Sequence, residues 1–129
     1  MPVANLLITG EGSADLHDFN DDVVVRVTLP AMKTGAWMLT ARVVIVNADD
    51  GLQNASARLT TDDGATVLDL VDDIRCGGYD TPRDKPISLQ ADLRSHGSEQ
   101  IVDLRCSTYN GTARYGRLFA LRVDDVQSQ

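Results

Sequence analysis

The strict alternation of side-chain character between Ala36 and Asn47 constrains the fold of this chain more than any other feature. In this segment Trp37, Leu39, Ala41, Val43 and Ile45 alternate with Met38, Thr40, Arg42, Val44 and Val46. Successive side chains of a β-strand point to opposite faces, so one face here is wholly apolar and the other is mixed. The same alternation returns in ISLQADL (87–93) and in GRLFALRV (116–123). Long strands with one apolar face are typical of a sandwich or a barrel.

Turn signals at short intervals divide the whole chain into strands. The expected strands cover residues 5–9, 23–29, 36–47, 55–60, 65–71, 87–95, 100–108 and 116–126. A polar loop is expected at 12–22, and irregular segments are expected at 72–86 and 109–116, because these contain Gly, Pro or many charged residues. No helix of ordinary length is expected. The sequence therefore predicts one all-β domain over residues 1–129, an antiparallel two-sheet sandwich with an eight-stranded jelly roll as the preferred arrangement.

The net charge and the hydropathy of the chain limit the kinds of partner that it can bind. The net charge is −7, which argues against nucleic acid and against an anionic membrane surface. No apolar run is long enough to span a bilayer, so no membrane insertion is expected. The N-terminal residues lack the basic region of a secretion signal. We expect a cytoplasmic protein or a component of a particle assembled in the cytoplasm, unless the chain leaves without a cleaved leader or has lost its leader.

Few residues are arranged for catalysis. His17 is flanked by Asp15 and Asp18, and His96 lies in a turn, but both are better interpreted as solvated histidines. No cysteine or serine has a base at a recognisable spacing, and the histidines and cysteines lack zinc-ligand spacing. The sequence predicts no enzyme and no cofactor.

The two cysteines leave two interpretations open. Cys106 shares a strand face with Val102 and Leu104, which indicates a small buried hydrophobic residue. Cys76 lies in the expected irregular segment, where a disulfide to Cys106 would tie that segment to the sheet. The absence of a leader favours a reducing compartment and two free thiols.

Acidic doublets suggest a weak calcium candidate in NADDG, with Asn47, Asp49 and Asp50 as oxygen ligands. The spacing matches no complete calcium loop. Turn chemistry is therefore the favoured explanation of the doublets, and no metal site is predicted.

Exposed aromatic side chains on loops form the best candidate for a ligand-binding surface. Trp37 belongs to the apolar face of its strand and is expected in the core. The candidate ligand-binding residues are Tyr79, Tyr109, Asn110 and Tyr115, which lie in or beside expected loops.

Four segments carry a resemblance to known proteins. These are TLPAMKTGAWMLTARVVIVN, SLQADL, VDLRCSTYNGTAR and LFALRVDDV, which together with their surroundings span residue 28 onward. Their pattern resembles a group of small uncharacterised sandwich proteins from high-GC bacteria and their phages. The layout is also similar to the tumour-necrosis-factor/C1q-like jelly roll. That resemblance implies that the long strand and the last strand lie in one sheet and that three subunits pack around an axis.

These observations favour a non-catalytic interaction or structural module, with a homotrimer as the preferred assembly. The expected role is a particle, fibre or receptor-binding component. The expected interface consists of Met38, Val44, Val46, Phe119 and Leu121, which are too apolar for open solvent. The alternative for that face is that another part of the same subunit covers it. The alternative function is a lectin-like domain that binds carbohydrate, with or without calcium, through loop aromatics and Asp or Asn.

Overall fold

The computed structural model describes residues 6–49, 51–77 and 83–123, and these residues form eight strands and no helix. The strands are β1 (Leu7–His17), β2 (Asp22–Leu29), β3 (Ala36–Asn47), β4 (Gln53–Thr61), β5 (Thr66–Cys76), β6 (Asp84–Arg94), β7 (Gln100–Thr108) and β8 (Asn110–Val123). Within those ranges no helix could cross a membrane.

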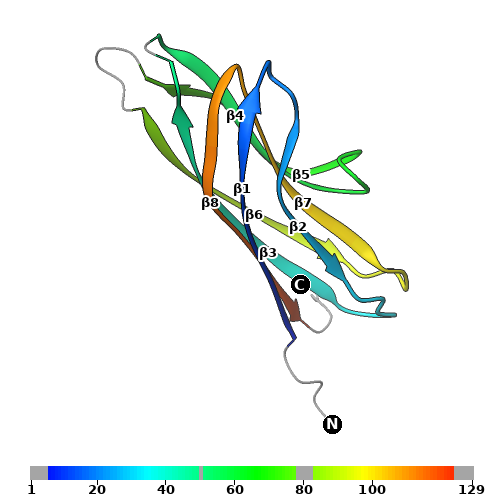
Figure 1. The fold of residues 1–129 in the computed structure, drawn as a ribbon. Coiled ribbons are helices and arrows are strands. Elements are labelled where there is room, and N and C mark those ends of the chain that lie inside the picture. Colours follow the sequence, from blue (N-terminus) through cyan, green and yellow to red (C-terminus); the bar gives the residue numbers. More distant parts are fainter. Residues whose placement is uncertain (1–5, 50, 78–82, 124–129) are drawn as a thin grey trace.

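The strands form two four-stranded antiparallel sheets. Sheet A has the order β1-β8-β3-β6 and sheet B has the order β2-β7-β4-β5. The two sheets lie against each other as layers (Figure 1). Two sheets of this strand order make an eight-stranded jelly roll, so the predicted fold class is confirmed. As expected, the long strand β3 and the last strand β8 are neighbours in one sheet.

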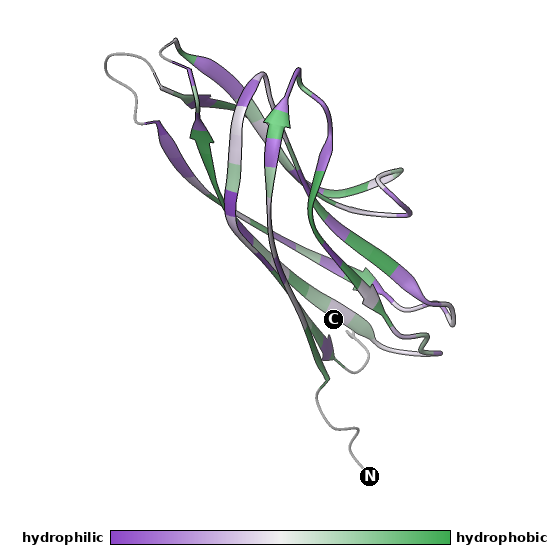
Figure 2. Cartoon of the chain, viewed as in Figure 1, coloured by the Kyte–Doolittle hydropathy of each residue, from purple (hydrophilic) through white to green (hydrophobic). Residues whose placement is uncertain are grey.

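The core fills the space between the inward faces of the two sheets. Sheet A contributes Trp37, Leu39, Ala41, Val43, Ile45, Leu89 and Leu118, and sheet B contributes Val27, Ala57, Leu59, Val102, Leu104 and Cys106. Along β3, buried side chains alternate with exposed or half-buried ones, and the strands of both sheets carry hydrophobic as well as hydrophilic residues (Figure 2). Trp37 is fully buried, which confirms its predicted core role.

Three segments that were expected to be loops are strands over part of their described length, and residues 78–82 of one of them lie outside the described residues. β1 continues through His17 across the expected polar loop, because its inward positions are small residues that hide the alternation. Gly12 is one of them: a Cβ there would lie 2.1 Å from the carbonyl oxygen of Val24. β5 continues to Cys76. Asp73, at φ +53°, lies in a β-bulge, where β5 has one residue more than β4, and the strand continues past it. β6 begins at Asp84 and β8 at Asn110, where irregular segments were expected.

Of the two interpretations of the cysteines, the structure has the two free thiols and not the disulfide. Cys76 and Cys106 are both free and buried. Cys76 is paired with Gln53 of β4, and Cys106 is paired with Ala57 on the other side of β4. A whole strand and an offset of four residues therefore separate the two cysteines, whereas a disulfide needs Cα atoms within roughly 7 Å.

Candidate functional site

An apolar patch occupies one end of the outer face of sheet A. Leu121 of β8 is paired with Leu7 of β1 on one side and with Met38 of β3 on the other. These three side chains are 39%, 55% and 46% exposed. Phe119, half-buried, lies two residues further along β8 on the same face. We call Leu7, Met38, Phe119 and Leu121 the apolar patch.

The predicted interface is only partly a single surface. Met38, Phe119 and Leu121 lie together in the apolar patch. Val44 and Val46 are half-buried on the same face of β3, but Arg42 stands between them and Met38. The five predicted residues all lie on the outer face of sheet A, and arginines from β3 and β8 divide that face.

Three arginines follow the apolar patch on this face. Arg117 of β8 is paired with Arg42 of β3, and Arg114 of β8 is paired with Val44. Glu11 of β1 lies opposite Arg117 on its other side, with 3.7 Å between Nε and Oε1. Arg42 and Arg114 have no ion pair within the described ranges. We call Arg42, Arg114 and Arg117 the arginine cluster.

Tyr115 projects from an irregularity in β8 beside this cluster. Its backbone has φ +56°, and it is 74% exposed. The register of β8 shifts here against both β1 and β3, which interrupts the alternation and turns the ring outward. One hollow of about 240 Å³ beside it is lined by Arg42, Val44, Pro86, Ser88, Tyr115 and Arg117. A second hollow is lined by Glu11, Ser13, Arg114, Tyr115 and Arg117.

The other predicted ligand-binding residues lie elsewhere or outside the described ranges. Tyr109 is 53% exposed in the β7–β8 turn, where its ring is 6.1 Å from that of Phe19. Tyr115 lies six positions further along the chain, which is roughly 20 Å along a strand. Asn110 donates from Nδ2 to Asp49 Oδ1 (2.9 Å) and from its backbone nitrogen to Gln53 Oε1 (2.9 Å), so it fastens the turn. Tyr79 lies outside the described residues.

Asn47, the first residue of the weak calcium candidate, has a structural role. Its side-chain nitrogen donates to the carbonyl oxygens of Gly51 (2.7 Å) and Cys76 (2.8 Å), and its Oδ1 accepts from the Asp49 nitrogen (2.8 Å). The amide of Asn47 thus holds the loop closed rather than facing an ion site. Asp50 lies outside the described residues. Across the described ranges, no three His, Cys, Asp or Glu side chains come together as a metal site.

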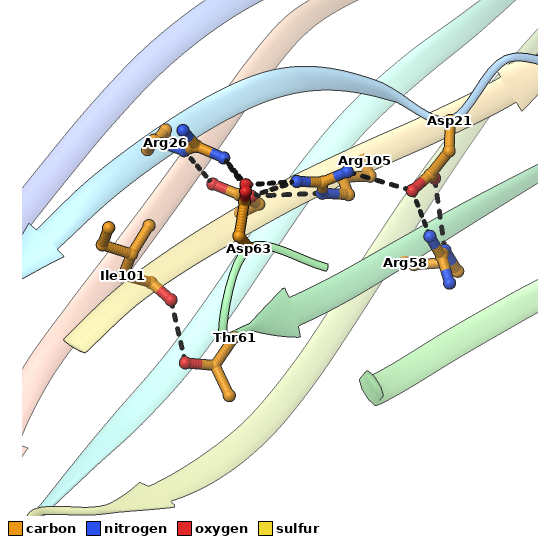
Figure 3. Close-up of polar contacts among 8 residues, drawn as sticks. Asp21, Arg26, Arg58, Thr61, Asp63, Ile101 and Arg105 are labelled. Carbon is orange, nitrogen blue, oxygen red and sulfur yellow. Dashed lines mark hydrogen bonds and ion pairs between the residues drawn. The ribbon is translucent and has the colours of Figure 1, made fainter. Parts of the chain in front are cut away.

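The outer face of sheet B carries an ion-pair network that the sequence did not indicate (Figure 3). The Asp103 side chain, only 1% exposed, accepts from Arg26 Nε (2.7 Å) and from Arg105 Nη2 (2.9 Å). Asp63, in the β4–β5 turn, contacts the same two arginines at 2.5 and 3.0 Å. Asp21 joins Arg105 to Arg58. Apart from Asp103 and Arg105, the bonded residues of this network are far apart in the sequence. The pairing of the strands brings them together.

The charges of this network are balanced around Asp103. Burial alone would raise the pKa of Asp103, but hydrogen bonds and charges from Arg26 and Arg105 outweigh it and lower the pKa below its ordinary value. The opposite effect governs the nearby thiol, because burial raises the pKa of Cys106 to about 12. Neither group has a pKa near neutral pH, which acid–base or nucleophilic chemistry requires.

The two-sheet arrangement is similar to that of proteins from viral particles of known structure. The chain is similar to the VP2 protein of infectious bursal disease virus in derived T=1 particles, with 13% identity over 92% of this chain and a TM-score of 0.54. It is also similar to a protein of the T13 particle of that virus, with 12% identity over 91% of this chain and a TM-score of 0.56. The chain spans about a third of those proteins, 32% and 31% of their lengths. These identities show the fold alone.

A weaker likeness joins the chain to the C-terminal CBM6 of LamC from Zobellia galactanivorans. That likeness has 19% identity over 88% of this chain and 98% of that one, but its TM-score is only 0.39. No family model matches the chain, and no curated protein matches it in sequence. The class defined by fold and site is therefore a jelly-roll sandwich with one outer face carrying an apolar patch, an arginine cluster and an exposed tyrosine.

Proposed function

We propose that this chain is a non-catalytic structural module that assembles with copies of itself, as a trimer, through the apolar patch of sheet A. The observation that carries this proposal is the row formed by Leu7, Leu121 and Met38. Three adjacent strands each place a large apolar side chain there, and each is at least 39% exposed.

An exposed cluster of large apolar side chains costs free energy in water, and such clusters commonly mark interfaces. The alternative, that another part of the same subunit covers this face, finds no support among the described residues, which leave the row open. Closed symmetry lets each copy bury the same patch.

Two further features support a role in an assembly. The similar viral proteins are described as parts of particles, and they use the same jelly-roll arrangement. The resemblance to bacterial and phage sandwich proteins points the same way. We therefore favour a particle or fibre component over a receptor-binding head.

The oligomeric state of the purified chain tests this function. Light scattering coupled to size-exclusion chromatography is expected to give a trimer for the wild type and a monomer for Leu121→Asp. Leu70→Asp is the matched control, because Leu70 is 47% exposed on β5 of the other sheet. A wild type that stays monomeric at high concentration, or equal dissociation by both substitutions, contradicts the proposal.

Carbohydrate binding is the second candidate function. It is favoured by Tyr115, whose exposed ring lines two hollows on an open sheet face, each with both polar and apolar residues in its lining. Exposed aromatic rings pack against the apolar face of a sugar ring, and the surrounding polar groups provide hydrogen bonds. Titration with a panel of neutral and acidic oligosaccharides tests it, with calcium and with a chelator.

A further inference from the structure

Among the described residues, the arginine cluster has one ion pair, between Arg117 and Glu11, for its three positive charges. Arg42 and Arg117 lie directly opposite each other on neighbouring strands, an arrangement that destabilises a sheet. Glu11 contacts Arg117 only at 3.7 Å, and both of these side chains are more than half exposed. This arrangement occurs in a chain with net charge −7, where carboxylates are plentiful. A bound anion would relieve the repulsion.

The hollow between Arg42 and Arg117 is suited to an acidic group. Its lining contains both arginines, Ser88 and the ring of Tyr115, and it contains no carboxylate. Guanidinium groups hold carboxylates and sulfates through paired, charge-assisted hydrogen bonds. Glu11 lines only the second hollow, on the far side of Tyr115, where it can accept hydrogen bonds from hydroxyl groups.

We propose that this surface binds an acidic oligosaccharide, with a uronate carboxylate or a sulfate between Arg42 and Arg117 and a sugar ring against Tyr115. This inference rests on the second candidate function and is independent of self-association. The first hollow, at about 240 Å³, falls below the roughly 300–1,000 Å³ of pockets for larger ligands and suits a single ring.

Isothermal titration calorimetry with defined probes tests the proposal. The probes are trigalacturonate for a carboxylate, a heparin tetrasaccharide for a sulfate, neutral maltotetraose, and a phosphoserine peptide. We expect at least one acidic saccharide to bind and the neutral one to bind at least tenfold more weakly. Arg42→Gln and Arg117→Gln should each weaken the acidic saccharide at least tenfold. Arg75→Gln, an equal loss of charge on the exposed side of β5, should leave its affinity unchanged.

The aromatic contact has its own variant. Tyr115→Asn removes the ring, and Asn tolerates the left-handed backbone at this position, so circular dichroism should show an intact fold. We expect a loss of affinity of at least tenfold.

The other outcomes overturn specific parts of the proposal. Equal binding of neutral and acidic saccharides would overturn the acidic ligand but keep the carbohydrate-binding function. No saccharide binding would overturn both, while the light-scattering result would still decide self-association. Tighter binding of the phosphopeptide, an equal effect of Arg75→Gln, or unchanged affinity in Tyr115→Asn would each contradict the site described here.

Discussion

Asp103 shows how a single residue can depend on the whole topology. Asp103 lies on the outer face of sheet B, where side chains are usually in contact with water. Its side chain is nevertheless only 1% exposed. It remains charged because Arg26 from β2 and Arg105 from its own strand both donate to it. Isolated charges are very costly to bury, and two hydrogen-bonded arginines offset that cost.

We predict that Asp103→Asn lowers the free energy of unfolding by about 3 kcal/mol at pH 7, because it leaves two arginines without their buried partner. Asp63→Asn is the control. Asp63 contacts the same arginines but is 75% exposed, so its loss should cost less than about 1 kcal/mol. Urea unfolding measures both values.

The same residue predicts a pH dependence. The pKa of Asp103 is lower in the folded state, so its stabilisation is complete above the ordinary carboxyl pKa of about 4 and is lost as the pH falls through the folded value. The difference in unfolding free energy between wild type and Asp103→Asn should therefore shrink below about pH 4. A difference that stays constant down to pH 2 would contradict this account.

At the scale of elements, the sequence predicted strands well where inward residues were large. β3 and β7 have the predicted bounds, because Trp, Leu, Val and Ile make their alternation plain. The second half of β1 and the first part of β8 were missed, because Gly12 and Ala113 face inward and give little hydrophobic signal. The candidate site was predictable only in part. Tyr115 stood out as an aromatic residue, but pairing across strands places the arginines beside it, and no local pattern encodes that pairing.

The turn of the β4–β5 hairpin folds over the ion-pair network on the outer face of sheet B. Asp62, Asp63 and Gly64 all have positive φ, so the turn bends sharply and brings Asp63 back over the two arginines (Figure 3). A Cβ at Gly64 would lie 2.8 Å from Arg105 Cζ. Arg105 cannot move aside freely, because Asp21, Asp63 and Asp103 all hold it.

We predict that Gly64→Ala is more destabilising than Gly97→Ala. Both glycines have nearly the same backbone, φ +89° and +88°, so each substitution carries a strain of about 1–2 kcal/mol. Nothing lies within 4 Å of a Cβ at Gly97, whereas the new methyl group at Gly64 displaces Arg105 and should add about 1 kcal/mol or more. Equal midpoints in urea would show that the hairpin is not seated on Arg105 as described.

At the scale of the whole molecule, the two outer faces differ. On sheet B, the β4–β5 hairpin covers part of the outer face and the charges of the ion-pair network are balanced, while Val23, Val67 and Leu70 are exposed. Sheet A exposes apolar side chains and unpaired arginines within the described ranges. The row of apolar side chains on three adjacent strands and the arginines without an ion pair are our reasons for proposing that the protein interacts through sheet A. The core between the two sheets provides the stability.

The two cysteines report on that interior. Both are about 1% exposed, and burial raises the pKa of each thiol, to about 12 for Cys106, so almost no reactive thiolate exists in the native state. We predict that iodoacetamide at pH 8 adds nothing to the native protein over the time in which free cysteine reacts fully. In urea without reductant, mass spectrometry should show two adducts, since the thiols are free. Labelling of Cys106 should follow the global unfolding equilibrium, because its strand lies between β2 and β4 in the middle of sheet B.

Two observations would contradict this account of the cysteines. Rapid labelling of Cys106 in the native protein would mean that the sheets separate locally. An unfolded chain without label would mean that the cysteines are bonded to each other.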